Sequence, residues 1–237
     1  MGLRHDQGIV LRAYPFGEAD RVVVLLSPNT GRLRVVAKGI RKTKSRFGGR
    51  LEPFTQVDLV LYEGRGLGTV TQVAVIEAYP VLRRHLDRVV TAGAMVEAVD
   101  AVAQEEEPSA RLFLLLQRGL RALETVGSSP DLLTAYLLKL AAAIGVAPSL
   151  DRCAGCGGPG PLRFSFDAGG AVCQRCRPEG AVRLRAGVAE RLAVLAAADL
   201  DDLPPDDQSL AGESFGVTRR FVEHHLDRRL TAATVDW

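Results

Sequence analysis

The chain has 237 residues, of which 47% are hydrophobic, and its formal net charge is only +2. Such values are ordinary for a globular protein with one large domain or two to three small ones. No uncharged apolar run of 18 residues occurs and the first 20 residues are charged every few positions, so we expect a cytoplasmic protein without a leader or membrane span, whose four cysteines do not form disulfides.

Residues 1–80 are predicted to form a five-stranded OB-fold barrel that binds nucleic acid. Short Val-rich segments separated by turn formers predict strands at 7–14, 20–27, 31–38, 56–64 and 68–79. A small antiparallel sheet avoids exposed edges by closing, and the closed five-stranded solution is the OB-fold, whose face and loops bind single strands. These 80 residues carry 12 Lys or Arg but only 7 Asp or Glu.

After residue 80, apolar residues recur at steps of three and four, which predicts helices. We assign residues 81–150 to the first part of an α-helical domain and residues 183–237 to its C-terminal part. One helix should begin after Ser129 as N-cap and end at Gly145, and its nearly continuous apolar surface predicts a buried central position. A last helix is predicted over residues 217–230. The predicted fold class is therefore α+β and multidomain.

Four cysteines carry the most specific motif of the chain. Cys153, Cys156, Cys173 and Cys176 form two C-x2-C pairs separated by sixteen residues, which is the spacing of a zinc ribbon. Four thiolates fill a tetrahedron and leave no position for water, so we predict one structural Zn2+ in a zinc-ribbon-like insertion at residues 151–182. The alternative is a set of free structural thiols.

Motifs for catalysis are missing. The stretch GIRKTKS (39–45) lacks the glycine that a phosphate-binding loop places before its lysine, and no histidine stands in the His-x-Glu motif of a zinc deaminase. We find no Ser/His/Asp or Cys/His grouping. We therefore predict that the protein has no catalytic residues and is not an enzyme.

A basic segment joins the third and fourth predicted strands. From Arg32 to Arg50 it contains eight cations and no Asp or Glu. We predict that it holds phosphates of a nucleic acid while an aromatic ring stacks on a base; the alternative is a solvated surface loop. The predicted DNA-binding residues are Arg34, Lys38, Arg41, Lys42, Lys44, Arg46, Arg50 and Phe47.

The order of these parts resembles the bacterial DNA repair and recombination mediator family RecO. Residues 8–64, 135–157 and 219–230 carry the resemblance, and KSRFGGRLEPF (44–54) is its most distinctive stretch. The resemblance implies an OB-fold that binds single- and double-stranded DNA, followed by a helical domain with a zinc module. Some members lack a complete set of cysteines, so zinc is not expected to perform the shared function.

The resemblance also implies partners. Members of this family anneal complementary strands, contact the acidic C-terminal tail of the single-strand DNA-binding protein, and act with RecR to help RecA load on coated DNA near the nucleoid. Arg118, Arg121 and Lys139 are candidates for the tail contact, against the alternative of ordinary surface cations. Two other readings stay open: an RNA-binding OB-fold and zinc-ribbon protein, and a scaffold that binds only proteins.

Overall fold

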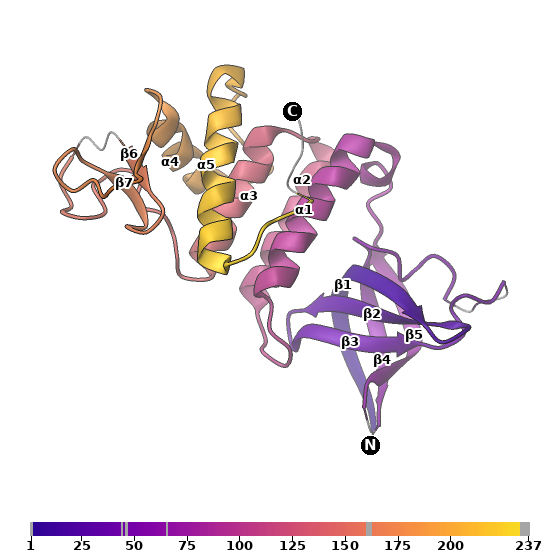
Figure 1. The fold of residues 1–237 in the computed structure, drawn as a ribbon. Coiled ribbons are helices and arrows are strands. Elements are labelled where there is room, and N and C mark those ends of the chain that lie inside the picture. Colours follow the sequence, from indigo (N-terminus) through magenta and orange to yellow (C-terminus); the bar gives the residue numbers. More distant parts are fainter. Residues whose placement is uncertain (1, 44, 46, 65, 160–162, 233–237) are drawn as a thin grey trace.

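The structure is a computed structural model that describes residues 2–43, 45, 47–64, 66–159 and 163–232. Figure 1 shows three parts in a row, with a β-barrel at one end, a helical bundle in the middle and a small sheet at the other end. The predicted fold class, an OB-like five-stranded barrel followed by a helical region with clustered cysteines, is confirmed. The four domain boundaries given above remain a prediction.

Five strands close the N-terminal barrel in the order β1-β2-β3-β5-β4, with β1 and β4 antiparallel at the seam and β3 parallel to β5. Alternate positions of each strand point inward, so valines and leucines fill the interior, together with Leu51 from the connection between β3 and β4. The strands are β1 (Gly2–Phe16), β2 (Asp20–Ser27), β3 (Gly31–Ala37), β4 (Gln56–Glu63) and β5 (Gly68–Glu77).

The bundle is built around the predicted central helix. Its elements are η1 (Leu82–Arg84), α1 (Leu86–Val102), α2 (Ala110–Thr125), α3 (Pro130–Ala143), α4 (Val188–Ala197) and α5 (Gln208–Leu226). The Ser129 side chain accepts a hydrogen bond from the Leu132 N–H at 3.1 Å, which confirms the predicted N-cap. α3 packs against all four other α-helices, and its Tyr136 is fully buried. No helix within the described ranges combines the length and hydropathy that a bilayer crossing requires.

The predicted last helix, residues 217–230, was placed too far along the chain. α5 begins after Asp207, whose carboxylate accepts the Ser209 N–H at 3.0 Å, and ends before Asp227, which adopts a left-handed φ of 47°. The chain then runs back across α1, where the Glu97 carboxylate accepts backbone N–H groups of Thr231 (3.0 Å) and Ala232 (2.6 Å).

One outer face of the barrel is part of the hydrophobic core of the bundle, whereas the barrel interior forms a separate core. Outward side chains of β1 and β2, among them Ile9 and Leu26, are buried against the helices. At the junction the Arg83 guanidinium donates to the Pro53 carbonyl (2.6 Å) and to Thr55 Oγ1 (2.8 Å). This packing holds the loops of the barrel in a defined position relative to the helices.

A small sheet carries the cysteines at the far end. Its strands β6 (Arg163–Ser165), β7 (Gly170–Val172) and β8 (Val182–Arg183) pair in the order β7-β6-β8. The ring of Phe164 packs edge-on against Phe221 of α5, with centroids 5.6 Å apart, so the sheet is anchored to the bundle by aromatic contact.

Gly119→Ala is expected to lower the free energy of unfolding. A Cβ at this position of α2 would lie 2.9 Å from Met95 Sδ and 3.0 Å from Tyr136 Cδ2. Overpacking of a core costs about 1–3 kcal/mol, which exceeds the gain of about 1 kcal/mol in helix propensity. Chemical denaturation followed by circular dichroism measures the change; the exposed Gly212→Ala in α5, where a Cβ meets nothing within 4 Å, is the control and should not destabilise.

Candidate nucleic-acid interface and metal centre

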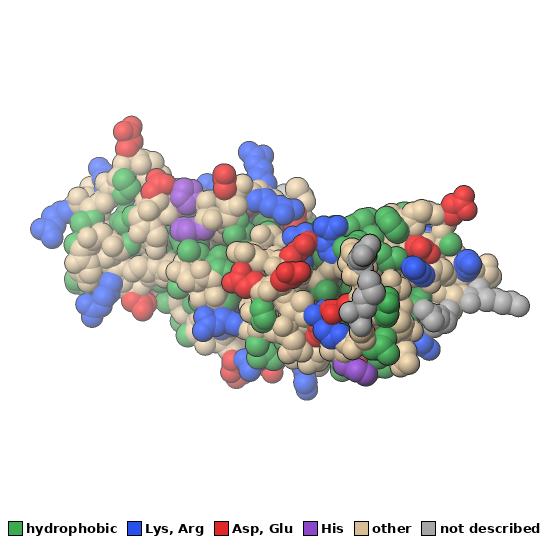
Figure 2. All heavy atoms as spheres, turned by 90° about the horizontal axis from the view of Figure 1, so that it is seen from below, with side chains coloured by type: hydrophobic (Ala, Val, Ile, Leu, Met, Phe, Trp, Pro, Cys, Tyr) green, Lys and Arg blue, Asp and Glu red, His purple; other side chains and the backbone are tan. Residues whose placement is uncertain are grey.

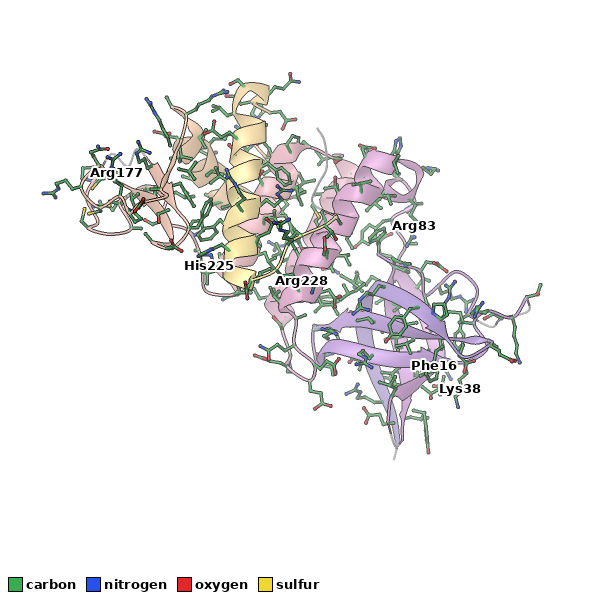
Figure 3. All side chains as sticks on the ribbon, in the orientation of Figure 1. Phe16, Lys38, Arg83, Arg177, His225 and Arg228 are labelled. Carbon is green, nitrogen blue, oxygen red and sulfur yellow. The ribbon has the colours of Figure 1, made fainter. Side chains whose placement is uncertain are left out.

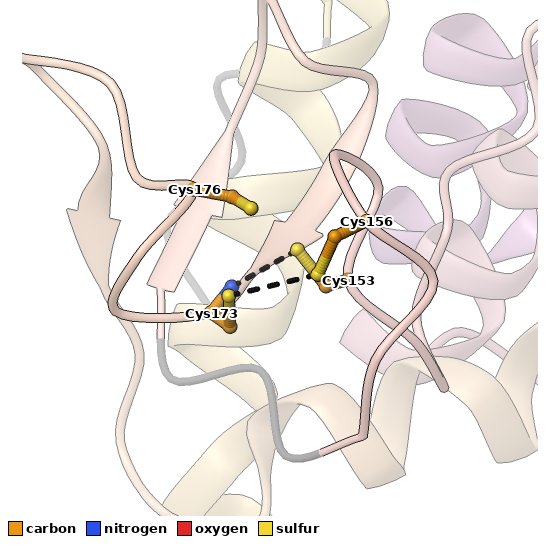
Figure 4. Close-up of side chains that lie close together, drawn as sticks. All are labelled: Cys153, Cys156, Cys173 and Cys176. Carbon is orange, nitrogen blue, oxygen red and sulfur yellow. Dashed lines mark hydrogen bonds between the residues drawn. The ribbon is translucent and has the colours of Figure 1, made fainter.

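The four cysteines converge on one point although two sheet strands separate the pairs. Figure 4 shows their side chains turned toward one another, and the four sulfurs lie within 4.8 Å of each other. Cys156 Sγ and Cys173 Sγ are 3.9 Å apart. A tetrahedral site with Zn–S bonds of about 2.3 Å needs sulfurs about 3.8 Å apart, so the donor set fits a zinc ion.

Backbone turns place these sulfurs. The Gly157 N–H donates to the Cys153 carbonyl at 2.7 Å, and Gly157 has the left-handed φ of 70° that closes such a turn most easily without a side chain. Gly155 is also required for space, because a Cβ there would lie 3.0 Å from Cys176 Cβ. The first knuckle is thus shaped by the left-handed backbone of Gly157 and by the close approach of Gly155 to Cys176.

The thiols of the cluster differ in acidity. The Cys173 N–H, which donates to Cys153 Sγ at 3.3 Å, lowers the pKa of Cys153 to about 6. Hydrogen bonds shared with Cys156 and Cys173 raise the pKa of Cys176 to about 12. Four thiolates therefore do not coexist at this spacing without a cation, and a bound divalent metal would supply the missing charge.

The predicted DNA-binding cations fall into two groups. Lys38, Arg41 and Lys42 are exposed in the connection between β3 and β4, which we call the cationic loop (residues 38–50). Arg50 at its end is exposed as well. Arg34 instead lies on β3, where its Nη1 is 3.5 Å from Glu105 Oε1. Two further residues of the prediction, Lys44 and Arg46, lie outside the described part of the chain.

The cationic loop begins beside the turn between β1 and β2. The Gly39 N–H donates to Asp20 Oδ1 at 2.7 Å and the Arg41 N–H to the Ala19 carbonyl at 3.0 Å. Phe16 ends β1 at this turn and is 51% exposed. Figure 3 shows Phe16 and Lys38 at the same end of the barrel. An aromatic ring and several cations therefore meet on one surface.

The predicted stacking role of Phe47 is wrong. Its ring is only 1% exposed and packs with Leu51 in the barrel interior, where it closes the end that the cationic loop covers. A ring buried in a core has no free face for a base. Phe16 has a free face, but the sequence does not distinguish it from Phe47, because each ring stands directly before a glycine with a left-handed φ.

Phe16→Ala is expected to weaken binding of single-stranded oligonucleotides by about 1–3 kcal/mol, the range measured for base–aromatic stacking. Fluorescence anisotropy with a labelled oligonucleotide measures the effect. Tyr62→Ala, which removes another exposed ring of the barrel, is the control and should leave affinity unchanged. Equal losses in both variants would contradict a specific role for Phe16.

A second basic surface lies in the bundle. A groove of about 720 Å3 between α2, α3 and the C-terminal end of α4 brings together the three helical-domain cations named above, Arg118, Arg121 and Lys139. Lys139 Nζ donates to the Ala196 carbonyl at 3.0 Å, and burial lowers the pKa of this lysine. Leu114, 48% exposed, contributes an apolar wall. The groove thus combines cations with apolar side chains, and two acidic residues, Asp199 and Asp201, also line it.

Comparison with known proteins identifies the family. The model of the recombination protein O N-terminal region matches residues 1–79, and that of the recombination protein O C-terminal region matches residues 83–233. The chain belongs to the RecO family. The two RecO models meet near Arg83, where the barrel joins the helices.

Curated RecO relatives agree over nearly their whole length. The DNA repair protein RecO of Frankia casuarinae is 44% identical over 98% of this chain and 97% of its own. That of Thermobifida fusca is 43% identical over 96% and 95%, and that of a Nocardioides species 41% identical over 96% of each. These relatives are named DNA repair proteins, so the resemblance to RecO inferred from the sequence is confirmed.

Proposed function

We propose that this protein is a recombination mediator that binds single- and double-stranded DNA, anneals complementary strands and helps load RecA on coated single-stranded DNA. The observation that carries the proposal is the exposed cationic loop beside the exposed ring of Phe16 on the barrel. No covalent bond is made or broken in annealing, so we infer that the protein is not an enzyme. We place it in the cytoplasm, near the nucleoid.

Annealing can follow from contacts that bind the phosphates of a strand and leave the pairing edges of its bases free. Lys38, Arg41 and Lys42 would neutralise backbone charge and release counterions, which reduces the repulsion between two strands. Stacking on Phe16 is indifferent to sequence because every base has a π-face. Because neither contact uses the pairing edge of a base, the bound strand can still form base pairs with a complementary strand.

We further propose that the groove of α2, α3 and α4 receives the acidic tail of the single-strand DNA-binding protein. Cations together with apolar side chains match a peptide that combines carboxylates with apolar groups. Arg118→Glu with Arg121→Glu is expected to abolish binding of a labelled tail peptide, because both side chains are exposed at the rim. Arg175→Glu with Arg177→Glu in the cysteine-bearing sheet is the charge-matched control. RecR and, indirectly, RecA are the other proposed partners.

The zinc ion proposed for the cysteine site has a structural role. Four thiolates complete its coordination and leave no position for a substrate, and the site lies at the opposite end of the molecule from the cationic loop (Figure 1). We therefore expect zinc to stabilise the small sheet without contacting DNA.

The test is annealing of two complementary DNA strands that are pre-coated with single-strand DNA-binding protein, followed by fluorescence without any nucleotide. Acceleration by this protein is the expected result. Unchanged annealing with intact DNA binding would reject the mediator role, and tighter binding to RNA than to DNA of the same sequence would favour an RNA-binding protein instead. No affinity for either nucleic acid would leave a scaffold that binds proteins.

A further inference from the structure

The outer face of β3 carries two arginines that continue toward the cationic loop. Arg32 and Arg34 alternate along the strand with inward-facing Val35 and lead to Lys38, where the loop begins. Beside them lies a groove of about 580 Å3, which is lined also by Arg4, by the glycines of the turn between β4 and β5, and by Glu63, Glu105 and Glu106. A row of cations on an open strand face is a surface that suits a phosphate backbone.

An acidic segment of the helical domain covers this row. Residues 104–107, Gln-Glu-Glu-Glu, follow α1 and lie against β3; we call them the acidic strap. The Arg32 N–H donates to the Gln104 carbonyl at 2.8 Å. The backbone of Glu105 pairs with Gly31 and Arg32 in isolated β-bridges. A Cβ at Gly31 would collide with the Glu107 carbonyl, so the glycine makes the close approach possible. Figure 2 shows acidic side chains gathered next to the barrel, with basic ones beside them.

Glu105 places a carboxylate between two arginines of the row. Its Oε1 lies 3.5 Å from Arg34 Nη1 and 3.7 Å from Arg32 Nη2, so one oxygen bridges both guanidinium groups. Arg32 Nε lies 3.4 Å from Asp100 Oδ1 and Arg4 Nε lies 3.0 Å from Glu63 Oε1, whereas the Nε–H group of Arg34 is shielded from solvent and has no partner among the described residues. Arg34 therefore has one donor that the strap does not use.

We propose that the outer face of β3 is a second part of the nucleic-acid interface and that Glu105 masks it in the free protein as a substitute for a phosphate. This inference rests on the proposed DNA binding, since it assigns Arg32 and Arg34 to the same path as the cationic loop. Binding of a strand would turn the Glu105 carboxylate away while the backbone of the acidic strap stays on β3.

Displacement of the Glu105 carboxylate costs little free energy. The Arg34 and Glu105 side chains are 39% and 50% exposed, and ion pairs of such exposure contribute little to stability. A phosphate backbone brings several charges and releases bound counterions, which a single carboxylate does not. Asp100 is 13% exposed and pairs with Arg12 at 2.9 Å and with Arg32 at 3.4 Å. These ion pairs would keep Arg32 in place when the Glu105 carboxylate moves.

Glu105→Gln tests the inference in the full-length protein. We expect affinity for a labelled oligo-dT to rise about three- to tenfold at low salt, with a slope of log Kd against log salt that is steeper by about one phosphate contact. Glu106→Gln is the matched control, since it makes the same change of net charge in the same strap and Glu106 has no ion pair among the described residues. In an Arg32→Ala, Arg34→Ala background, Glu105→Gln should have no effect.

Three results would overturn the inference: no gain for Glu105→Gln, an equal gain for Glu106→Gln, or a gain that persists without the two arginines. Thermal denaturation of each variant separates these from loss of structure, and lower stability with unchanged affinity would reveal a purely structural ion pair. If charge reversal in the cationic loop weakens binding while Glu105→Gln has no effect, the proposed masking by Glu105 is rejected and the proposed DNA binding is retained. If the unmodified protein binds no oligonucleotide, both fail.

Discussion

Charge reversal of Lys38, Arg41 and Lys42 to Glu is expected to weaken binding of single-stranded oligonucleotides about a hundredfold or more at low salt. Each side chain is exposed in the cationic loop, so each is able to neutralise one phosphate and its loss removes one set of released counterions. With about 0.7 counterions released per contact on a single strand, the salt slope should fall by about 2. Anisotropy titrations at four salt concentrations measure both quantities.

A charge-matched control separates local contact from net charge. Arg175, Arg177 and Arg183 are exposed in the cysteine-bearing sheet, and their reversal to Glu changes the net charge by the same amount at the far end of the molecule. We expect this variant to retain most of its affinity. Equal losses in the two variants would show that the protein attracts DNA only by its overall charge. Charge reversal in the cationic loop should not lower the melting temperature, because exposed cations contribute little to folding.

Cys173→Ser is expected to remove zinc and to unfold the small sheet. The unmodified protein should contain about one zinc per chain and the variant about a tenth of that or less, because three thiolates hold the ion far less tightly than four. Metal analysis measures the content, and hydrogen exchange should show lost protection in β6 and β7. Protons compete with the metal for the thiolates, so zinc affinity should also fall as the pH decreases, and Cys153 adds to this loss once the pH is below its pKa of about 6.

The exposed Gln174 lies between two cysteines of the second knuckle and provides the control. The Gln174→Ala variant should retain its zinc and the hydrogen-exchange protection of β6 and β7. Oligonucleotide binding should survive in both variants, since the cationic loop and the metal site lie at opposite ends. A zinc-free Cys173→Ser protein that loses DNA binding while the barrel remains folded would contradict the structural role.

Elements with a local cause were predictable from the sequence. The bounds of β2 coincide with the prediction at residues 20–27, because Val-rich residues end at turn formers on both sides. Ser129 was identified as an N-cap because its role depends only on the N–H groups of the next turn. The cysteine cluster was also predictable, since two short knuckles carry all four sulfurs.

Errors arose where a distant segment decides the outcome. Phe47 and Phe16 look alike in sequence, and only closure of the barrel buries one ring and leaves the other at a turn. The end of α5 was missed for a related reason: the chain after Asp227 leaves the helix to place Leu230 in the core and to contact Glu97 on α1. Neither contact leaves a periodic signal near its own position.

Sequence alone therefore determined the five-stranded barrel, the helical region that follows it, the grouping of the four cysteines and the positive charge of the cationic loop, because each depends on neighbours within a few turns or on residue type. Tertiary structure decided which charges are available. Arg34 lies within the same run of cations as Lys38, yet it is paired with Glu105, 71 residues away, while Lys38 faces solvent. Electrostatic contacts act through space, so only the packing of the helices on the barrel brings the acidic strap onto β3.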